Sequence, residues 1–517
     1  MTEGFGWLEK DRQLAKRDVS RSYGKSKREA AQAAAAAPRK VGNFVGGVFL
    51  QANDGRTIDD LNPATGEVIA RIPRSGPQEV DEAVRAAMKA FPAWSATALA
   101  KRCALLEKTA KLLEQQAEEL ARLESLDTGK PIALSRRMDI SRAVLNFRFF
   151  AEFAAEEAQE THKMDGHTNW TVRHPVGVVG LVTPWNLPLY LLSWKVAPAL
   201  AMGNTIVAKP SEMTPLTADA LAKVLKQAGL PDGVFNVVHG YGGEAGQALV
   251  EHPEVKAISF TGGTASGRKV AATAGPLLKK VSLELGGKNP TIVFADCDLE
   301  ETVKGVARAA FTNTGQICLC GSRILVEGNV AKEFTRRFVE HVKSWKVGDP
   351  MDDTTEVGAL ISKEHLAKVE SYLEMARAEG GKFLCGGARP LLDGALEGGN
   401  FLQPTVIAGL DQSSRCVQEE IFGPVATIQE FSSEAEAIEL ANGTRYGLAA
   451  SVWSGNKEKA ERVAESLRSG LVWINCWLVR DLRVPFGGTK DSGVGREGGR
   501  HSLDFFSELK SVCVTSG

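Results

Sequence analysis

The segment Ala-Ile-Ser-Phe-Thr-Gly-Gly-Thr-Ala-Ser-Gly at residues 257–267 joins an apolar run to a glycine-rich turn. The run at residues 257–260 predicts a buried strand, and residues 265–274 after the turn predict a helix. Three further apolar runs precede it, at residues 178–182, 205–208 and 235–238. Helix-forming stretches lie between these runs, near residues 215–228 and 243–251. Strict alternation of strand and helix over residues 176–285 predicts a parallel sheet with helices on its faces.

A second alternating region follows, from about residue 286 to 490, and it predicts a second α/β domain. Its helices are expected near residues 299–314, 331–345 and 363–379. Before both regions, from about residue 80 to 160, leucines recur at helical spacing between charged residues, which predicts helices. The final segment, Ser507 to Val514, alternates enough to form an edge strand, to which another subunit could add.

Length and composition describe a large globular protein. The 517 residues exceed what one hydrophobic core usually supports, so two or more domains are expected. Apolar residues make up 43% and charged residues 24% of a chain with net charge -1, which gives no electrostatic reason to expect nucleic acid as a partner. The eight cysteines contain no CxxC pair, so reduced thiols are favoured and no metal is expected.

One stretch could be mistaken for a membrane helix. From Pro175 to Trp194 the chain carries no charge over 20 residues, which meets the length test for a membrane span. Pro175, Pro184 and Pro188 would break one continuous helix, however, and residues 178–182 are typical of a buried strand. We therefore expect no membrane segment.

Residues 1–41 predict a basic extension, disordered or partly helical, outside the fold. The first 40 residues hold ten Lys/Arg against five Asp/Glu. A transit peptide is the functional alternative, but Glu3, Glu9, Asp11 and Asp18 count against it because such peptides are poor in acidic residues. A cytoplasmic location is expected, or a mitochondrial one if the extension is a presequence.

Two polar segments follow the predicted strands, where ligands bind such sheets. The turn from Thr261 to Gly267 would let a pyrophosphate approach the backbone closely. It does not match the GxGxxG fingerprint, and a purely structural turn is the alternative. Lys209-Pro210-Ser211-Glu212 offers an ammonium and a carboxylate for ribose hydroxyls, with a solvated charge pair as the alternative.

Two further residues could carry chemistry. Glu284 lies among apolar residues and glycines, surroundings that would raise its pKa and suit it to act as a base. A buried structural glutamate is the alternative. Cys318 follows a predicted helix between glycine and apolar residues, where most cysteines are inert core residues.

Together these segments resemble the aldehyde dehydrogenase family across residues 42–516. The seven shared motifs, in the family's order, are Pro184-Trp185-Asn186, Lys209-Pro210-Ser211-Glu212, Phe260-Thr261-Gly262, Glu284-Leu285-Gly286-Gly287-Lys288, Gly315-Gln316-Ile317-Cys318, Glu419-Glu420-Ile421-Phe422-Gly423-Pro424 and Pro485-Phe486-Gly487-Gly488. Seven ordered motifs are very hard to obtain by chance.

The resemblance implies an α/β fold with three parts. A Rossmann-like NAD-binding domain would comprise residues 42–160 and 175–285, and an α/β catalytic domain residues 286–490. A small β oligomerisation element would comprise residues 161–174 and 500–517. Because the family forms dimers and tetramers, a homodimer or homotetramer is expected.

Position by position, the resemblance also implies catalytic roles. Cys318 would be the nucleophile that attacks the aldehyde carbon, with Cys320 as a bystander. Asn186 would donate to the oxyanion together with the backbone N–H of Cys318. Glu284 would activate water against the thioester, so the product would be a free acid and not an acyl-CoA.

The cofactor-binding residues implied by the resemblance are Trp185, Lys209, Glu212, Gly262, Gly263, Glu420 and Phe422. Lys209 and Glu212 would hold the adenosine ribose, and the carboxylate favours NAD over NADP because it would repel a 2′-phosphate. Glu420 would bind the nicotinamide ribose, with Phe422 packed nearby. Gly262 and Gly263 would admit the pyrophosphate; many family members have serine at the second position.

Arg142 and Arg480 fall where the family lines its substrate tunnel, and guanidinium groups there suit a carboxylate on the substrate. Solvated surface arginines are the alternative. The segment Asn475 to Arg483 resembles the muconic semialdehyde dehydrogenase branch, which acts on 2-aminomuconic or 2-hydroxymuconic semialdehyde in tryptophan-kynurenine or aromatic catabolism. The resemblance therefore implies NAD-dependent oxidation of a carboxylate-bearing semialdehyde such as 2-aminomuconic semialdehyde.

Three alternatives stay open. The hydroxy analogue differs from 2-aminomuconic semialdehyde by one small group. Another semialdehyde or betaine aldehyde is a second possibility, although a quaternary ammonium substrate would want an aromatic or acidic tunnel. The third is a non-catalytic binding or structural protein of the same fold, against which the intact Cys318, Glu284 and Asn186 argue.

Overall fold

The structure is a computed structural model that describes residues 37–157 and 160–515. The predictions that residues 1–36 form a basic extension or a presequence lie outside the described residues. Contacts divide the chain between Arg39 and Lys40, inside the short strand β1 (Arg39–Lys40), and the following description concerns the part from Lys40 onward.

The first sheet has eight strands in the order β22-β12-β11-β8-β9-β10-β2-β3. Its five central strands are parallel: β8 (Val178–Val182), β9 (Thr205–Lys209), β10 (Phe235–Val237), β11 (Val255–Thr261) and β12 (Lys280–Glu284). The antiparallel strands beside them are β22 (Gly493–Val494), β2 (Asn43–Val45) and β3 (Val48–Leu50). The predicted parallel sheet and its four apolar strands are thus confirmed.

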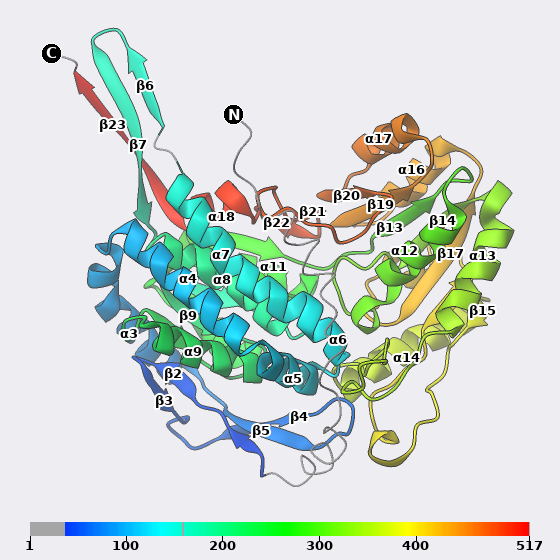
Figure 1. Cartoon of the computed structure of the whole chain (residues 1–517), viewed down its shortest axis with the longest axis horizontal. Helices are drawn as coiled ribbons and strands as arrows, with labels where there is room; N and C mark the ends of the chain where they lie inside the picture. The colour runs from blue at the N-terminus through cyan, green and yellow to red at the C-terminus, as the bar shows by residue number, and fades with distance from the viewer. Residues whose placement is uncertain (1–36, 158–159, 516–517) are drawn as a thin grey trace. The chain divides into compact units, whose positions relative to one another are not determined.

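Helices cover both faces of this sheet. Successive residues of a strand point to opposite faces, so neighbouring residues pack against different helices. Val179 and Leu181 pack into a cluster with α4 (Leu99–Gln115), α5 (Ala117–Thr128), α7 (Ser141–Glu156), α8 (Pro188–Ala201) and α9 (Leu216–Ala228). Val178, which precedes Val179 and points to the opposite face, packs with α3 (Pro77–Ser95), α10 (Gln247–Glu251) and α11 (Thr264–Ala274). Figure 1 shows α4, α7 and α8 layered on one side of the sheet.

The second sheet has seven strands in the order β15-β16-β17-β14-β13-β19-β20. Only the edge strand β15 (Lys382–Cys385) is antiparallel to its neighbour. The parallel strands are β16 (Thr405–Ala408), β17 (Val425–Phe431), β14 (Arg323–Glu327), β13 (Pro290–Val293), β19 (Ala449–Trp453) and β20 (Leu471–Ile474).

Its helices again form two layers. One layer is α12 (Leu299–Phe311) and α13 (Gly328–Lys343), and the other is α16 (Glu434–Asn442) and α17 (Lys457–Ser466). Helices α14 (Lys363–Ala378) and α15 (Arg415–Gln418) pack beside β16. The helix predicted to reach residue 314 ends at Phe311, because Asn313 and Thr314 have φ of 54° and 56° in the turn η5 (Thr312–Gly315). Positive φ cannot continue a right-handed helix.

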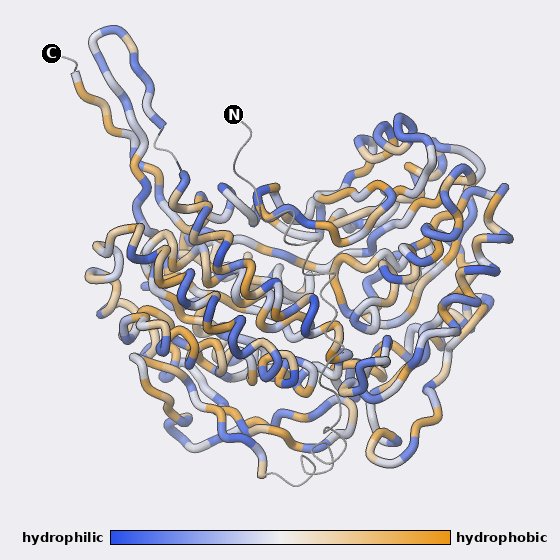
Figure 2. Tube along the Cα trace, in the orientation of Figure 1, coloured by the Kyte–Doolittle hydropathy of each residue, from blue (hydrophilic) through white to orange (hydrophobic). Residues whose placement is uncertain are grey.

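A three-stranded antiparallel ribbon is formed by β6 (Thr161–Met164), β7 (His167–Pro175) and β23 (Ser507–Thr515). Strand β23 pairs with β7 alone among the described residues, so the predicted edge strand is confirmed. Helix α18 (Gly499–Phe505) precedes it. Figure 2 shows hydrophobic residues near the C-terminal end of this ribbon, where Val514 is exposed.

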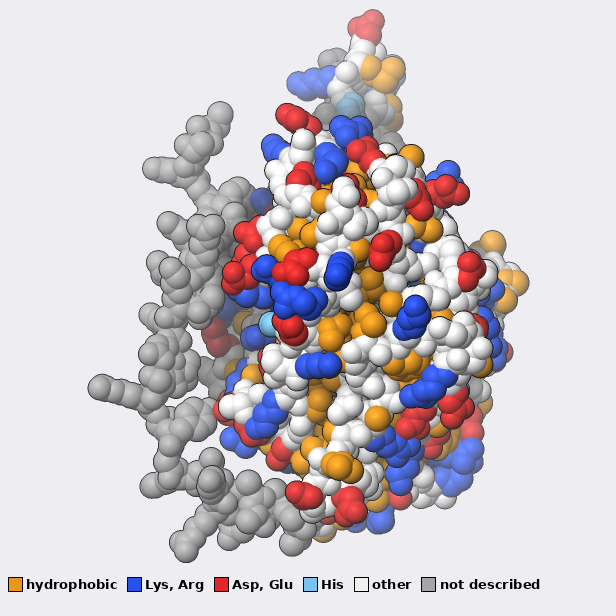
Figure 3. All heavy atoms as spheres, turned by 90° about the vertical axis from the view of Figure 1, so that its right-hand side faces the viewer, with side chains coloured by type: hydrophobic (Ala, Val, Ile, Leu, Met, Phe, Trp, Pro, Cys, Tyr) orange, Lys and Arg blue, Asp and Glu red, His pale blue; other side chains and the backbone are white. Residues whose placement is uncertain are grey.

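The remaining short elements are β4 (Thr57–Leu61), β5 (Val68–Pro73), α6 (Ile132–Leu134), the π-helices η2 (Ser135–Ile140) and η3 (Gly242–Gly246), the 3-10 turns η4 (Gly275–Leu277) and η6 (Gly394–Leu396), and the pair β18 (Tyr446–Gly447) and β21 (Thr489–Lys490). Within residues 37–157 and 160–515, no helix is both long and apolar enough to cross a membrane. Figure 3 shows acidic and basic side chains intermixed on one face of the molecule.

Candidate active site

Cys318 follows helix α12 across a sharp turn. Asn313, Thr314 and Gly315 all have positive φ, which turns the chain back towards the first sheet's motifs. A Cβ added at Gly315 would lie 2.1 Å from the carbonyl oxygen of Gly423, so glycine is required at this position. The turn therefore places the cysteine at the end of the helix, partly exposed.

The surroundings of Cys318 oppose ionisation of its thiol. Burial raises the pKa of Cys318, the carboxyls of Glu420 and Glu284 raise it further, and Arg480 lowers it. Cys320 is more deeply buried, and burial raises its pKa to about 12.

Asn186 lies between β8 and α8 and is buried. Its Nδ2 donates a hydrogen bond over 2.9 Å to the carbonyl oxygen of Gln316, two residues before Cys318. Because a primary amide has two N–H groups, one remains for a ligand. The structure therefore brings together Asn186 and the cysteine-bearing segment, 130 residues apart in sequence.

A buried ion cluster that sequence reasoning missed holds the backbone of Asn186. Nζ of Lys130 donates to the Asn186 carbonyl over 2.9 Å and to Asp139 over 2.8 Å. Glu124 lies 4.0 Å from the same ammonium, and Asn313 also donates to the Asn186 carbonyl, over 3.1 Å. The feature of the sequence that could have revealed this cluster is Lys130 itself, which stands between a glycine and a proline in an otherwise helical region.

Glu284 is the last residue of β12 and is buried, with neither carboxyl oxygen hydrogen-bonded among the described residues. Burial raises its pKa well above the usual value and Glu497 adds to the effect, whereas Lys195 and Arg496 oppose it. The raised pKa expected from the sequence is therefore present. A Cβ at Gly487 would lie 2.7 Å from Oε1 of Glu284, so this glycine makes room for the carboxyl.

Lys195 and Glu497, which act on the pKa of Glu284, were also missed. Nζ of Lys195 donates to Glu497 over 2.6 Å and to Oγ of Ser259 over 2.8 Å, and all three residues are buried. Lys195 is the only charged residue of helix α8, and this lone charge in an apolar helix was the signal in the sequence.

Glu420 lies directly over the glycine pair after β12. Its Oε1 accepts a hydrogen bond from the backbone N–H of Gly287 over 2.9 Å. A Cβ at Gly286 would lie 2.2 Å from Oε2 of Glu420, so a side chain there would displace the carboxylate. Burial raises the pKa of Glu420.

Phe422 belongs to an aromatic cluster with Trp185 and His365. Its ring centroid lies 5.3 Å from that of Trp185, and its φ of 62° is uncommon for a bulky residue. The carbonyl oxygen of Phe422 accepts a hydrogen bond from Nε2 of His365 over 2.6 Å. Burial lowers the pKa of His365 to about 4, so the ring is neutral at pH 7. His365, which sequence reasoning missed, therefore holds Phe422 in place.

Lys209 and Glu212 form an ion pair of 2.7 Å at the end of β9. Lys209 is only 3% exposed, which argues against a fully solvated pair. Gly262 and Gly263 form the turn between β11 and α11. A Cβ at Gly262 would lie 2.6 Å from the ring of Phe260, whereas a Cβ at Gly263 would meet nothing within 4 Å, so the family's serine would fit there.

Arg142 and Arg480 converge on Tyr190. Arg480 donates to the Tyr190 hydroxyl over 3.0 Å, and the Arg142 guanidinium lies 5.7 Å from the centre of the same ring. Arg480 also lies 4.9 Å from the Trp194 ring and 4.0 Å from that of Phe486. Nη1 of Arg142 and Nη2 of Arg480 are buried without a hydrogen-bond partner among the described residues. Both arginines are therefore half-buried and have donors free for an anion.

Comparisons with known proteins bear on this arrangement. The model of the "Aldehyde dehydrogenase family" matches residues 49–512. The chain is 52% identical over 476 residues to 2-aminomuconic semialdehyde dehydrogenase of Mus musculus, covering 91% of this chain and 97% of that one. It is 46% identical over 483 residues to 2-hydroxymuconic semialdehyde dehydrogenase of Pseudomonas sp. (strain CF600), covering 92% and 99%.

Among solved structures, PnpE in complex with nicotinamide adenine dinucleotide superposes with a TM-score of 0.90 at 44% identity, covering 92% of this chain and 97% of that one. The α/β fold expected from the sequence is thereby confirmed. With nearly the whole chain matched by the family model and by close relatives, this protein belongs to the aldehyde dehydrogenase family.

Proposed function

We propose that this chain is an NAD-dependent dehydrogenase that oxidises a carboxylate-bearing semialdehyde, such as 2-aminomuconic semialdehyde, to the free acid through a thioester on Cys318. The observation that carries the substrate class is the convergence of Arg142 and Arg480 on Tyr190, each with an unpartnered buried N–H group. A buried N–H group without an acceptor is costly, and a substrate carboxylate would satisfy both of them.

Cys318 is the nucleophile in this proposal. Its thiolate bonds to the aldehyde carbon, and the resulting oxyanion receives hydrogen bonds from Nδ2 of Asn186 and the backbone N–H of Cys318. Bound NAD supplies the acceptor for the hydride that leaves the carbon, and a thioester remains. Arg480 lowers the pKa of the Cys318 thiol, but its effect is smaller than the effects of burial, Glu420 and Glu284, which raise it.

Glu284 is the proposed base for the second half of the reaction. Its deprotonated carboxylate takes a proton from water, the hydroxide oxygen bonds to the thioester carbon, and the carbon–sulfur bond breaks to release the acid and the Cys318 thiolate. A buried carboxyl with a raised pKa is a stronger proton acceptor once ionised, which supports this role.

The residues present fit NAD. Glu420 over the side-chain-free Gly286 and Gly287 would hold the nicotinamide ribose, with Trp185 and Phe422 beside the ring. Lys209 and Glu212 would hold the adenosine ribose, and the carboxylate of Glu212 would repel the 2′-phosphate of NADP.

Gly262 and Gly263 would admit the pyrophosphate at the start of α11. On this proposal residues 42–160 and 175–285 form the NAD-binding domain, and residues 286–490 form the catalytic domain.

The ribbon is the proposed oligomerisation element, comprising residues 161–174 and 500–517. Within residues 37–157 and 160–515, one edge of strand β23 pairs with no other strand, and Leu509 and Val514 of this strand are exposed. An exposed edge with apolar side chains favours pairing with a second copy of the chain, giving a homodimer or homotetramer.

The decisive experiment follows NADH formation with 2-hydroxymuconic semialdehyde, hexanal and betaine aldehyde. Preference for the carboxylated substrate, by kcat/KM, is expected. Preference for hexanal or betaine aldehyde would leave a dehydrogenase but contradict the substrate class. Cys318→Ala should abolish turnover while NAD still binds, whereas the control Cys320→Ala should stay active; an active Cys318→Ala would contradict the thioester.

A further inference from the structure

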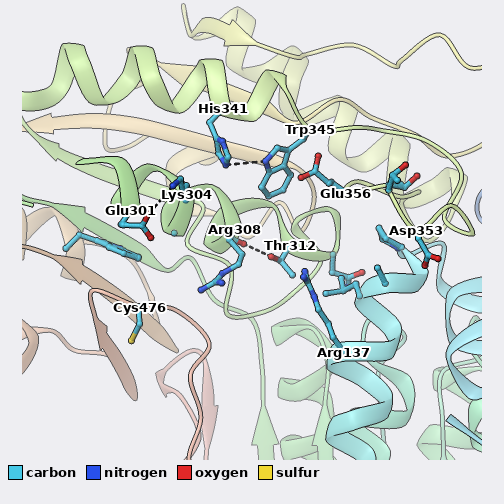
Figure 4. A pocket seen from close by; sticks show the side chains of 18 of the residues that line it. Arg137, Glu301, Lys304, Arg308, Thr312, His341, Trp345, Asp353, Glu356 and Cys476 are labelled. Carbon is cyan, nitrogen blue, oxygen red and sulfur yellow. Dashed lines mark hydrogen bonds and ion pairs between the residues drawn. The ribbon is translucent and has the colours of Figure 1, made fainter. Parts of the chain in front are cut away.

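A cavity of about 490 Å³ lies apart from the residues assigned to the substrate. Its walls come from residues 131–137, helix α12, the end of α13, residues 353–356 and the pair Asn475-Cys476 (Figure 4). Neither Arg142 nor Arg480 lines it. Its volume falls in the range typical of small-molecule sites, about 300–1,000 Å³.

The acidic groups on its wall already have partners. Glu301 accepts from Nζ of Lys304 over 3.0 Å, and Asp353 is paired with Arg136. Glu356 accepts from the backbone N–H of Lys346 over 3.0 Å. The negative charges of the cavity are therefore engaged by neighbouring donors.

The two arginines on the cavity wall, unlike the acidic groups, are not paired within the described part of the chain. Arg137 and Arg308 have no side-chain hydrogen bond or ion pair within residues 37–157 and 160–515, and Figure 4 shows both side chains reaching into the cavity from two sides. Both side chains are exposed to solvent. Partial desolvation and the nearby Arg308 lower the pKa of Arg137, although an arginine stays charged at pH 7. Two guanidinium groups thus share one cavity without a direct ion-pair partner among the described residues, beside three carboxylates that accept hydrogen bonds from other groups.

The other groups on the wall suit an organic anion. Trp345 and Trp453 offer apolar surface, whereas the hydroxyl of Thr312 on the same wall already donates to the carbonyl oxygen of Arg308 over 2.6 Å. Arg137 lies on the π-helix η2, and π-helical turns are frequent at functional sites.

We propose that Arg137 and Arg308 form a second oxyanion site, which binds a small molecule through its carboxylate or phosphate group. Two guanidinium groups facing one cavity suit a planar or tetrahedral oxyanion. The site is distinct from the Arg142 and Arg480 pair, so one protomer binds two anions.

The position of this site couples it to the substrate arginines. Arg137 lies on η2, which runs directly into α7 and Arg142. Cys476 lies on the cavity wall four residues before Arg480 in the same loop. Anion binding is therefore expected to change the KM for a carboxylated substrate, since both segments that carry the substrate arginines also line the cavity.

The test is isothermal titration calorimetry of the full chain saturated with NAD, with inorganic phosphate in one arm and succinate in the other. NAD fills the pyrophosphate site, and no aldehyde is present, so the result is independent of the proposed substrate. Binding of one or both probes is expected in the wild type. Arg137→Gln and Arg308→Gln should each raise Kd at least about tenfold. The control Arg462→Gln, on the exposed α17 and paired with Glu434, should bind like the wild type.

The two arms distinguish a phosphate site from a carboxylate site, and a second readout guards against misfolded variants. The stronger probe should raise the melting temperature of the wild type but not of Arg308→Gln. No binding to the NAD-loaded wild type would overturn the proposal. Binding that survives Arg308→Gln but disappears in Arg480→Gln would also overturn it, because the anion would then occupy the substrate site.

Discussion

The hydroxyl of Tyr190 accepts a hydrogen bond over 3.0 Å from Nη1 of Arg480. Tyr190 lies on helix α8 and Arg480 on the loop after β20, and the ring of Tyr190 also contacts the Arg142 guanidinium. One tyrosine thus contacts two guanidinium groups, each of which has one buried nitrogen without a hydrogen-bond partner among the described residues. Preorganised donors of this kind cost little additional order when an anion binds.

Arg480→Gln and Arg142→Gln should each lower kcat/KM for 2-hydroxymuconic semialdehyde by about 30-fold, because losing a charged hydrogen bond to a carboxylate costs about 2 kcal/mol or more. Activity with hexanal should change much less. The matched control is Arg483→Gln, in the same loop, where the exposed arginine pairs with Asp481. Equal losses with both aldehydes would mean that the arginines act on the fold and not on the carboxylate.

Glu284→Gln should stop thioester hydrolysis while leaving acylation possible. One equivalent of NADH should form rapidly, and mass spectrometry should detect the acyl group on Cys318, with steady-state turnover reduced by about a hundredfold or more. Glu251→Gln, at the end of helix α10 on the surface, serves as the control. Undiminished steady-state turnover in Glu284→Gln would remove this residue from the role of base.

The pH dependence of thioester hydrolysis should report the raised pKa of Glu284. The base works only when deprotonated, so the rate should rise with pH and reach half its maximum well above pH 4.5, the ordinary pKa. Because Glu497 raises and Lys195 lowers this pKa, Glu497→Gln should move the midpoint down and Lys195→Met should move it up. Stopped-flow profiles that shift the opposite way would contradict the assignment.

Lys130→Met should reduce both stability and turnover. It would leave the buried carboxyls of Asp139 and Glu124 without their cation, and breaking a buried ion pair costs about 3–5 kcal/mol of unfolding free energy. The Asn186 carbonyl would lose one donor, so kcat should fall more than KM rises. Chemical denaturation and steady-state kinetics test this, with Lys223→Met as the exposed, ion-paired control. A variant as stable and active as the control would show that Lys130 does not position Asn186.

Glu212→Gln should weaken the preference for NAD. Removing the carboxylate removes repulsion of a 2′-phosphate, so KM for NADP should fall several-fold while KM for NAD rises about tenfold through the lost ribose hydrogen bond. Initial rates with both cofactors measure the ratio, and Glu254→Gln on the surface is the control. An unchanged ratio of kcat/KM values would place Glu212 outside the ribose site.

The sequence predicted the elements well where the signal was local. Strand β8 was predicted to the residue, and helix α9 to within one, because apolar periodicity and flanking glycines act over a few residues. The end of α12 was predicted three residues too late although Asn313 and Gly315 favour turns, because the positive φ of the β-branched Thr314 is not a local preference of that residue.

Some residues of the site could be predicted from the sequence and others could not. Glu284 and Cys318 stand in recognisable motifs, and the raised pKa of Glu284 followed from its apolar neighbours. Lys130, Lys195 and His365 were not found, because each acts through a partner that is distant in sequence, such as Glu497, 302 residues from Lys195. A single sequence holds no record of such contacts.

By itself, the sequence determined the alternation of strands and helices, the glycine turns and the chemical groups available, since these depend on local backbone preferences and hydrophobic period. Tertiary structure alone decided that Arg480 meets Tyr190 across 290 residues, that Lys130 holds Asn186, and that Arg137 and Arg308 share a cavity. The physical reason is that burial, free hydrogen-bond donors and pKa shifts arise only when segments from both sheets pack together and exclude water.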